Sequence, residues 1–228
     1  MGKRLRDLLK GFDKEKHYSL AEAVAFLKKT ATTRFDETLE VAINLAIDSR
    51  KADQNIRGMV TMPHGTGKTV RVIVFCKDLK VEEALAAGAD RAGAEDLIAH
   101  VQKTIDFDLC IATPDMMASV GKLGKVLGPK GLMPNPKLGT VTSDVATAVK
   151  NAKGGQVEFR TEKAGIVHAG LCKMHFSPAQ IEESVKAFVG AVVRARPTGI
   201  KGSYIKKVSL STTMGPGLKL ELGEVYSF

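Results

Sequence analysis

Hydrophobic residues occur with two different periods in the two outer parts of the chain. The large ones alternate with polar residues or alanine over 39–47, which is the period of a strand with one buried face. After Ser19 and after Ser177 they recur every three or four positions, and each serine precedes Glu or Gln by three residues, the capping-box spacing that begins a helix. Further strands are expected over 59–62, 156–160, 165–174, 204–213 and 218–222, and a short basic helix over 3–10.

The middle of the chain has a different pattern, in which apolar residues form continuous runs over 70–76 and 107–112. Such runs are typical of strands that are covered on both faces. The alternation of these strands with helical patterns predicts a small α/β unit with parallel pairing. Helices are expected over 81–87 and 94–103, from Pro114 with Thr113 as the N-cap, and up to Ala152 with Thr142 and Ser143 as the cap.

We therefore predict two domains, of α/β and α+β class. Residues 1–66 and 158–228 form a discontinuous α+β sandwich of the split β-α-β type, and residues 67–157 form an inserted, Rossmann-like, three-layer α/β domain. The net charge of +9 is divided unevenly, because 67–157 contain 12 basic and 10 acidic side chains and the rest contains 22 and 15. The discontinuous domain is thus the expected partner of a polyanion.

Composition excludes several classes of protein. No run approaches the ~18 apolar residues of a membrane span, and the charged N-terminus lacks the apolar segment of a signal peptide. The three cysteines, Cys76, Cys110 and Cys172, form no CxxC pair and fall in strand-like runs, so reduced core thiols are expected. We expect a cytoplasmic protein without membrane contact. Aromatic residues make up only 5% and Trp is absent, which argues against a base-stacking platform.

Two glycine-rich segments invite a nucleotide-binding interpretation, and both fail on spacing. Residues 64–69 end in Gly-Lys-Thr, but the first glycine of a phosphate-binding loop would fall on Met62, and a strand follows where a helix is required. The glycines within 121–128 do not have the spacing of a dinucleotide-binding loop. The interpretation favoured for 64–69 is a hinge between the two domains.

A metal site is also not expected. His168, Cys172 and His175 do not share one face of a strand, and no fourth ligand is evident. We therefore expect no cofactor, no metal and no enzymatic activity. The alternative is a small α/β enzyme or binding protein for a phosphorylated ligand, which would use Lys68.

Two loops suit contact with RNA. Residues 128–136 contain three prolines and two glycines, which predict a rigid, extended loop. Residues 209–217 place hydroxyl groups, Met214 and two glycines at a strand end, where ribose and phosphate can approach closely. The alternative interpretation is that each loop is an ordinary surface turn with no binding role. The candidate contact residues in and around the first loop are Lys122, Lys125, Gly128, Lys130, Asn135 and Lys137.

The run Lys-Leu-Gly-x-x-Leu-Gly-Pro-x-Gly-Leu-Met-Pro-Asn within 119–135 resembles the signature of the ribosomal protein L-one family, the stalk protein of the large ribosomal subunit. Residues 34–38, 53–58, 63–65 and 212–216 resemble the same family in the same order, and the pattern is bacterial in type. The resemblance implies a protein that binds the stalk of large-subunit rRNA, helps deacylated tRNA leave the exit site and represses its own operon mRNA. It implies no catalysis and no cofactor, and we expect a monomer outside the ribosome.

The resemblance also implies which residues contact RNA. Phe35 and Met214 would pack on ribose, neutral groups such as Thr213 would form hydrogen bonds, and Glu37 and Glu40 would accept from 2′-hydroxyl or base amino groups. The full set, carried over by matching motifs, is Phe35, Glu37, Thr38, Glu40, Lys163, Gly165, His168, Ser211, Thr213, Met214 and Gly215.

Overall fold

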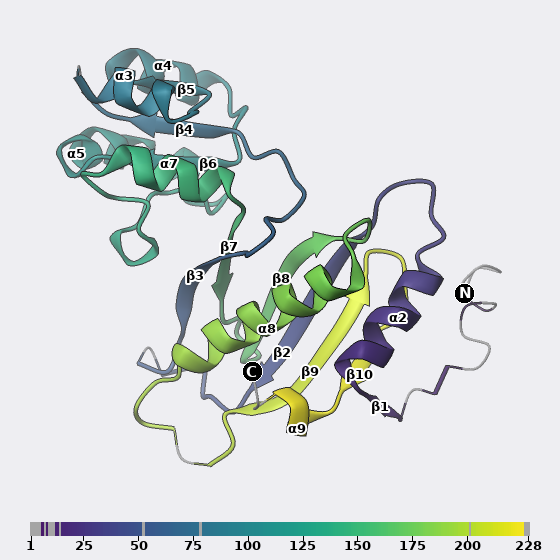
Figure 1. The fold of residues 1–228 in the computed structure, drawn as a ribbon. Helices are drawn as coiled ribbons and strands as arrows, with labels where there is room; N and C mark the ends of the chain where they lie inside the picture. Colours follow the sequence, from purple (N-terminus) through teal and green to yellow (C-terminus); the bar gives the residue numbers. More distant parts are fainter. Residues whose placement is uncertain are drawn as a thin grey trace. The chain divides into compact units, whose positions relative to one another are not determined.

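The structure is a computed structural model that describes residues 6, 8, 12–13, 15–51, 53–77, 79–200 and 202–225. It is a mixed α/β protein with several sheets (Figure 1). The chain divides into two compact units, a discontinuous unit of Met1–Gly67 with Val157–Phe228 and a middle unit of Lys68–Gln156. The basic helix predicted over 3–10 falls mostly on residues outside those described.

A five-stranded sheet forms the centre of the discontinuous unit. Its strand order is β1-β10-β9-β2-β8. The pair β1 and β10 is parallel, and all the other neighbours are antiparallel. The strands are β1 (His17–Tyr18), β10 (Leu218–Leu220), β9 (Ile205–Thr212), β2 (Thr38–Leu45) and β8 (Ile166–Lys173).

Two helices, α2 (Leu20–Thr30) and α8 (Pro178–Arg194), cover one face of this sheet and pack against each other (Figure 1). The alternation along β2 explains why. Its odd-numbered residues from Leu39 to Leu45 are buried in the core beneath the helices, whereas Glu40, Ala42 and Asn44 stay at least partly exposed on the other side. We call this other side the open face, and it also carries the residues that lie opposite these three on β8 and β9.

The two helices begin at the predicted serine caps. Ser177 accepts a hydrogen bond from the Gln180 amide, and the Gln180 side chain accepts one from the Ser177 amide, which completes the capping box. Ser19 accepts from the Glu22 amide at 3.3 Å, but the Glu22 carboxylate pairs with Lys16. The predicted box is therefore complete at α8 and half formed at α2.

Two smaller elements complete the discontinuous unit. Strands β3 (Arg57–Thr61) and β7 (Gln156–Arg160) form a two-stranded ribbon. The ribbon packs on α8 through Phe159 and Phe188, whose rings meet edge to face at 5.6 Å. The last predicted strand ends earlier than expected, because Leu222 already begins the short helix α9 (Leu222–Val225).

The middle unit is built on a three-stranded parallel sheet, in the order β5-β4-β6. Its central strand β4 (Val72–Phe75) is buried along its whole length, as the continuous apolar run predicts. Alternate residues of this strand belong to two separate cores, one on each face. The other strands are β5 (Arg91–Gly93) and β6 (Leu109–Ala112).

Helices of the middle unit pack on both faces of this sheet. One core contains residues of α3 (Leu79–Ala86) and α7 (Val145–Lys153). The other contains residues of α4 (Glu95–Lys103) and of the short helical turns that follow β6. These turns are η1 (Pro114–Met116), α5 (Met117–Val120), η2 (Gly121–Leu123) and α6 (Gly124–Leu127), and a further turn is η3 (Pro136–Leu138).

Several local expectations need correction. The cap of α7 is Asp144, whose side chain accepts from the Thr147 amide at 3.1 Å, and not Thr142 or Ser143. The helix predicted from Pro114 begins there, with Thr113 at the N-cap, but it is a series of short turns from η1 to α6. Strands β1 and β5 were not predicted. These two strands are too short to display a period, and pairing with the distant strands β10 and β4 defines them.

Candidate nucleic-acid interface

Three of the predicted RNA contacts meet in one hollow on the open face. The strand register places Glu40 opposite Gly170 and Ser211, and Ala42 opposite His168. These five residues line a shallow hollow of about 270 Å³. Glu40 and His168 are exposed, and Ser211 is partly exposed. The hollow therefore offers a carboxylate, an imidazole and a hydroxyl group to a ligand that lies on the sheet.

Glu37, by contrast, is buried. Only 2% of its surface is exposed. One carboxylate oxygen accepts from the Thr33 hydroxyl at 2.9 Å, and the other accepts from the Met214 amide at 3.0 Å. The expectation that this carboxylate reaches a 2′-hydroxyl group does not fit its burial. Glu37 instead ties together two loops that are distant in the sequence.

The same two loops are joined a second time by Thr38 and Thr213. The Thr213 hydroxyl accepts from the Thr38 amide at 3.0 Å, and the Thr213 amide donates to the Thr38 carbonyl at 3.2 Å. The Thr213 side chain is exposed, but its hydroxyl already accepts a hydrogen bond from within the protein. Residues 33–38 and 212–215 form one rigid surface, which we call the joined loops.

The joined loops present two large apolar side chains to solvent. Phe35 is 54% exposed and Met214 is 52% exposed, and Leu85 of the middle unit is the third exposed large hydrophobic residue among those described. Full burial of such a side chain is worth about 1.5–3 kcal/mol, so covering the exposed half of each would contribute about 1 kcal/mol. Two of them on one rigid surface suit a partner that covers both.

Gly215 closes the joined loops, and the structure explains the residue type. A Cβ atom at this position would overlap the Oγ1 atom of Thr212, whose side chain is itself buried. Any other residue would therefore force the Thr212 side chain or the loop itself to move. This places Gly215 among the residues that shape the surface.

Lys163 and Gly165 lie at the other end of β2. The Leu45 amide donates to the Gly165 carbonyl at 3.0 Å, and Ser49 donates to the Lys163 carbonyl. Lys163 is exposed, but Gly165 is buried and has a φ of +74°. Gly165 therefore shapes the turn before β8, and Lys163 is the member of the predicted pair whose side chain reaches solvent.

The loop predicted in the middle unit, residues 128–136, is surrounded by lysines and anchored to a core, and we call it the basic loop. Its side chains Leu132 and Met133 pack against the core that contains α4. The side-chain oxygen of Asn135 accepts from the Lys137 backbone amide at 2.9 Å, and the backbone amide of Asn135 donates to the Thr140 hydroxyl at 2.8 Å. Asn135 therefore supports the loop. Four lysine side chains are exposed and have no acidic partner among the described residues, namely Lys122, Lys125, Lys130 and Lys137.

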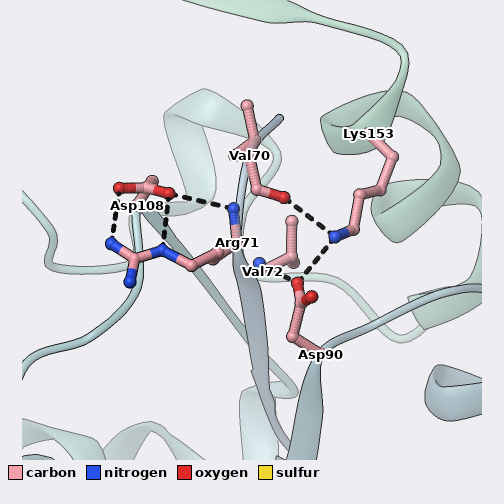
Figure 2. Close-up of polar contacts among 6 residues, drawn as sticks. All are labelled: Val70, Arg71, Val72, Asp90, Asp108 and Lys153. Carbon is pink, nitrogen blue, oxygen red and sulfur yellow. Dashed lines mark hydrogen bonds and ion pairs between the residues drawn. The ribbon is translucent and has the colours of Figure 1, made fainter. Parts of the chain in front are cut away.

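A network of charged groups joins the starts of the three strands in the middle unit (Figure 2). The Arg71 guanidinium lies across the Asp108 carboxylate with two contacts of 3.2 Å. Lys153 donates to the Val70 carbonyl at 2.8 Å and to Asp90 at 2.6 Å. These groups lie at the amino ends of the strands, and ligands in parallel sheets bind at the carboxyl ends. The network is thus a structural clamp.

The pKa values of the carboxylates in this clamp reflect their partners. The hydrogen bond from Arg71 lowers the pKa of Asp108. Desolvation acts to raise the pKa of Asp90, but hydrogen bonds from Lys153 and from the Val72 amide outweigh it, and the pKa lies below its usual value. Both carboxylates are therefore held in the charged form.

The remaining candidate sites have ordinary structural explanations. All three cysteines are free and buried, and desolvation raises the pKa of Cys172 to about 11. Within the described ranges no group of three or more His, Cys, Asp or Glu side chains is arranged to hold a metal ion. Lys68 is exposed, and the chain beyond it enters β4, so no helix begins there to bind a phosphate. In the part of the chain that the structure describes, no helix has the length and apolar character needed to cross a membrane.

Sequence reasoning did not single out Thr33, which donates to Glu37. Its role depends on a carboxylate that is fixed by Met214, 177 positions further along, and no local pattern signals such a contact.

A comparison of the sequence with models of protein families matches residues 27–216 to the family described as "Ribosomal protein L1p/L10e family". The match covers most of the chain and includes the joined loops, the residues of the hollow and the basic loop. It confirms the resemblance that the motifs suggest. The chain therefore belongs to the ribosomal protein L1p/L10e family, and it is a structural, rRNA-binding protein of the large subunit of the cytoplasmic ribosome.

Proposed function

We propose that the discontinuous unit grips the stalk of the large-subunit rRNA with its joined loops and the hollow on its open face. The observation that carries this proposal is the gathering of residues from distant segments. Glu40, His168 and Ser211 line one hollow, and Met214 is bonded to Glu37 beside it. The residues of this unit also include most of the positive charge of the chain, which attracts a phosphate backbone.

The chemistry of the surface suits folded RNA. Phe35 and Met214 are exposed apolar groups that can cover ribose faces, and the hollow supplies neutral and acidic groups that can hydrogen-bond to 2′-hydroxyl and base amino groups. Glu40 repels phosphate, so it selects for the hydroxyl and amino groups of the ligand. Recognition of this kind reads the shape of an RNA and distinguishes it from DNA.

The test is a binding titration with a transcript of the stalk region of the organism's own large-subunit rRNA. We expect tight binding, and strong loss of binding by a folded variant with Thr213→Val and Met214→Asp. The proposal would be overturned if the folded wild-type protein did not bind this transcript at low ionic strength. Normal binding by the double variant would overturn the assignment of the joined loops.

We further propose that the same surface binds the protein's own operon mRNA and represses its translation. A fold in the mRNA that resembles the rRNA stalk would make the two RNAs competitors for one surface. A reporter preceded by the operon leader should therefore be repressed by the wild type and released by added stalk transcript. Repression that persists in the Thr213→Val, Met214→Asp double variant would contradict a shared site.

The basic loop of the middle unit is the proposed contact for deacylated tRNA at the exit site. Its four exposed lysines present positive charge on a loop that is fixed by Leu132, Met133 and Asn135. Replacing Lys122, Lys125, Lys130 and Lys137 by Gln should slow tRNA release from ribosomes and leave stalk binding unchanged. An unchanged release rate would remove this role.

A further inference from the structure

The proposed RNA contacts lie at both ends of β2, and a stretch of open face separates them. Thr38 and the joined loops lie at the start of the strand, and the turn with Lys163 lies beside Leu45 at its end. Seven steps of ~3.3 Å separate Thr38 from Leu45, which is about 23 Å. An RNA that touches both ends must cross the sheet between them.

The strand register shows which residues lie along this crossing. Asn44 lies between Ile166 of β8 and Lys207 of β9, and Ala42 lies between His168 and Ser209. Asn44 and Ser209 are partly exposed, and Lys207 is exposed. Beyond the hollow the open face is therefore lined by an amide, a hydroxyl group and an ammonium group.

Lys207 is a positive charge of this stretch that is available to a ligand. Its neighbour Lys219, which lies opposite Ser209, is paired with Glu15 at 3.1 Å. Among the described residues, no acidic side chain pairs with Lys207, and no side chain forms a hydrogen bond with the side-chain amide of Asn44.

The β9 strand has a bulge beside Lys207, and the bulge affects where the lysine side chains point. The pairing with β2 shifts between Asn44 and Leu45, so that Leu45 faces Ile205 and Lys206 is the extra residue. Such a bulge re-aims the neighbouring side chains. Both Lys206 and Lys207 are exposed between the buried residues Ile205 and Val208.

We propose that Lys207, with Asn44 and Ser209 beside it, forms a second RNA subsite that binds one phosphate group and its adjoining ribose. This inference rests on the proposed function and extends it along the sheet. Glu40 lies four residues before Asn44 on the same strand, about 13 Å away. Glu40 repels phosphate while Lys207 attracts it, so the charges fix the phosphate at the Lys207 end and the ribose or base at the hollow.

The experiment measures the affinity of the full chain for the stalk rRNA transcript as a function of KCl concentration. Lys207→Met should lower the affinity several-fold and reduce the slope of log K against log salt by about 0.7–0.9, the value for one lost phosphate contact. The matched control is Lys29→Met, because Lys29 is exposed on α2 over the other face of the sheet. The control should leave the slope unchanged.

Asn44→Ala is the second variant, and it should weaken binding while the salt slope stays at the wild-type value. Equal losses in Lys207→Met and Lys29→Met would mean that only net charge matters, and they would overturn the subsite. Wild-type behaviour of both Lys207→Met and Asn44→Ala would overturn it as well. If the wild type itself fails to bind the transcript, the proposed function fails, and that outcome is distinct from the failure of the subsite alone.

Discussion

The backbone amide of Met214 donates a hydrogen bond of 3.0 Å to the buried carboxylate of Glu37. The bond connects the loop before β2 to the loop after β9, which are otherwise far apart in the chain. Because Glu37 also accepts from Thr33, the carboxylate has a partner on each loop. The position of the exposed Met214 side chain thus depends on a residue that does not itself reach the surface.

Replacing Glu37 tests this dependence. Glu37→Met removes the carboxylate that accepts from the Met214 amide, whereas the Thr33 hydroxyl keeps the Phe35 carbonyl as an acceptor at 2.9 Å. We therefore expect the free energy of unfolding to fall by ~1–3 kcal/mol and RNA affinity to fall with it. Glu37→Gln should behave much more like the wild type, because its amide oxygen can face Met214 while its NH₂ group donates to Thr33. Urea unfolding and RNA titration measure both effects. Equal damage by Gln and Met would show that the charge of Glu37, and not its geometry, is essential.

Met214 itself should matter for RNA and little for the fold. Its side chain is 52% exposed, so Met214→Ala removes few contacts within the protein and should change the free energy of unfolding by about 0.5 kcal/mol or less. The affinity for stalk RNA should fall by ~1–3 kcal/mol, the scale of a well-placed contact. Leu85→Ala is the matched control, because Leu85 is 48% exposed in the middle unit. A similar loss of affinity in both variants would contradict a specific role for Met214.

Gly215→Ala should disturb the joined loops through the backbone. The added methyl group would overlap Thr212 Oγ1, so either this buried side chain or the loop must move, and we expect a destabilisation of ~1–3 kcal/mol together with weaker RNA binding. Gly217→Ala is the control two residues away, where a Cβ atom meets nothing within 4 Å. Its stability and affinity should both stay close to the wild-type values. The same pair of measurements, unfolding and RNA titration, decides the comparison.

Long periodic segments made much of the fold predictable. The alternation over 39–47 identifies β2 and its buried side, and the Ser177 box identifies the start of α8. The continuous apolar run before Cys76 identifies β4 as buried on both faces. By contrast, β5 has three residues and β1 has two, and neither length can display a period. Their pairing partners alone define them.

The candidate site was predictable in part for the same reason. Strand periodicity puts Glu40 and His168 on the polar side of their strands, but only the register reveals that they line one hollow with Ser211. The burial of Glu37 follows from contacts made 177 positions away, so its neighbours in the sequence do not signal it. Gly165 is similar, because its burial depends on β2 passing beside it. Motifs name the candidate residues, and tertiary contacts decide whether each one is exposed to a ligand or supports the fold.

The clamp of the middle unit predicts how acid affects its stability. The pKa of Asp90 and that of Asp108 are both lowered in the folded state, so each carboxylate stabilises the fold at pH values above its unfolded pKa of ~3.9. This contribution is lost as the pH falls through the lower pKa of the folded state. The middle unit should therefore become less stable below about pH 4. The Val72 amide, which donates to Asp90 at 2.7 Å, provides an NMR signal that reports both the titration and the unfolding.

Asp90→Asn separates this effect from general acid unfolding. The side chain of Asp90 is 44% exposed, so solvent screens its pairing with Lys153, and the variant should lose about 1 kcal/mol or less at neutral pH. The difference between variant and wild type should shrink as the pH falls, because the wild-type carboxylate becomes neutral as well. Asp115→Asn is the control, since Asp115 is exposed in η1 and has no ion-pair partner among the described residues. A gap between Asp90→Asn and wild type that stays constant down to pH values well below ~3.9 would mean that the charge of Asp90 does not stabilise the clamp.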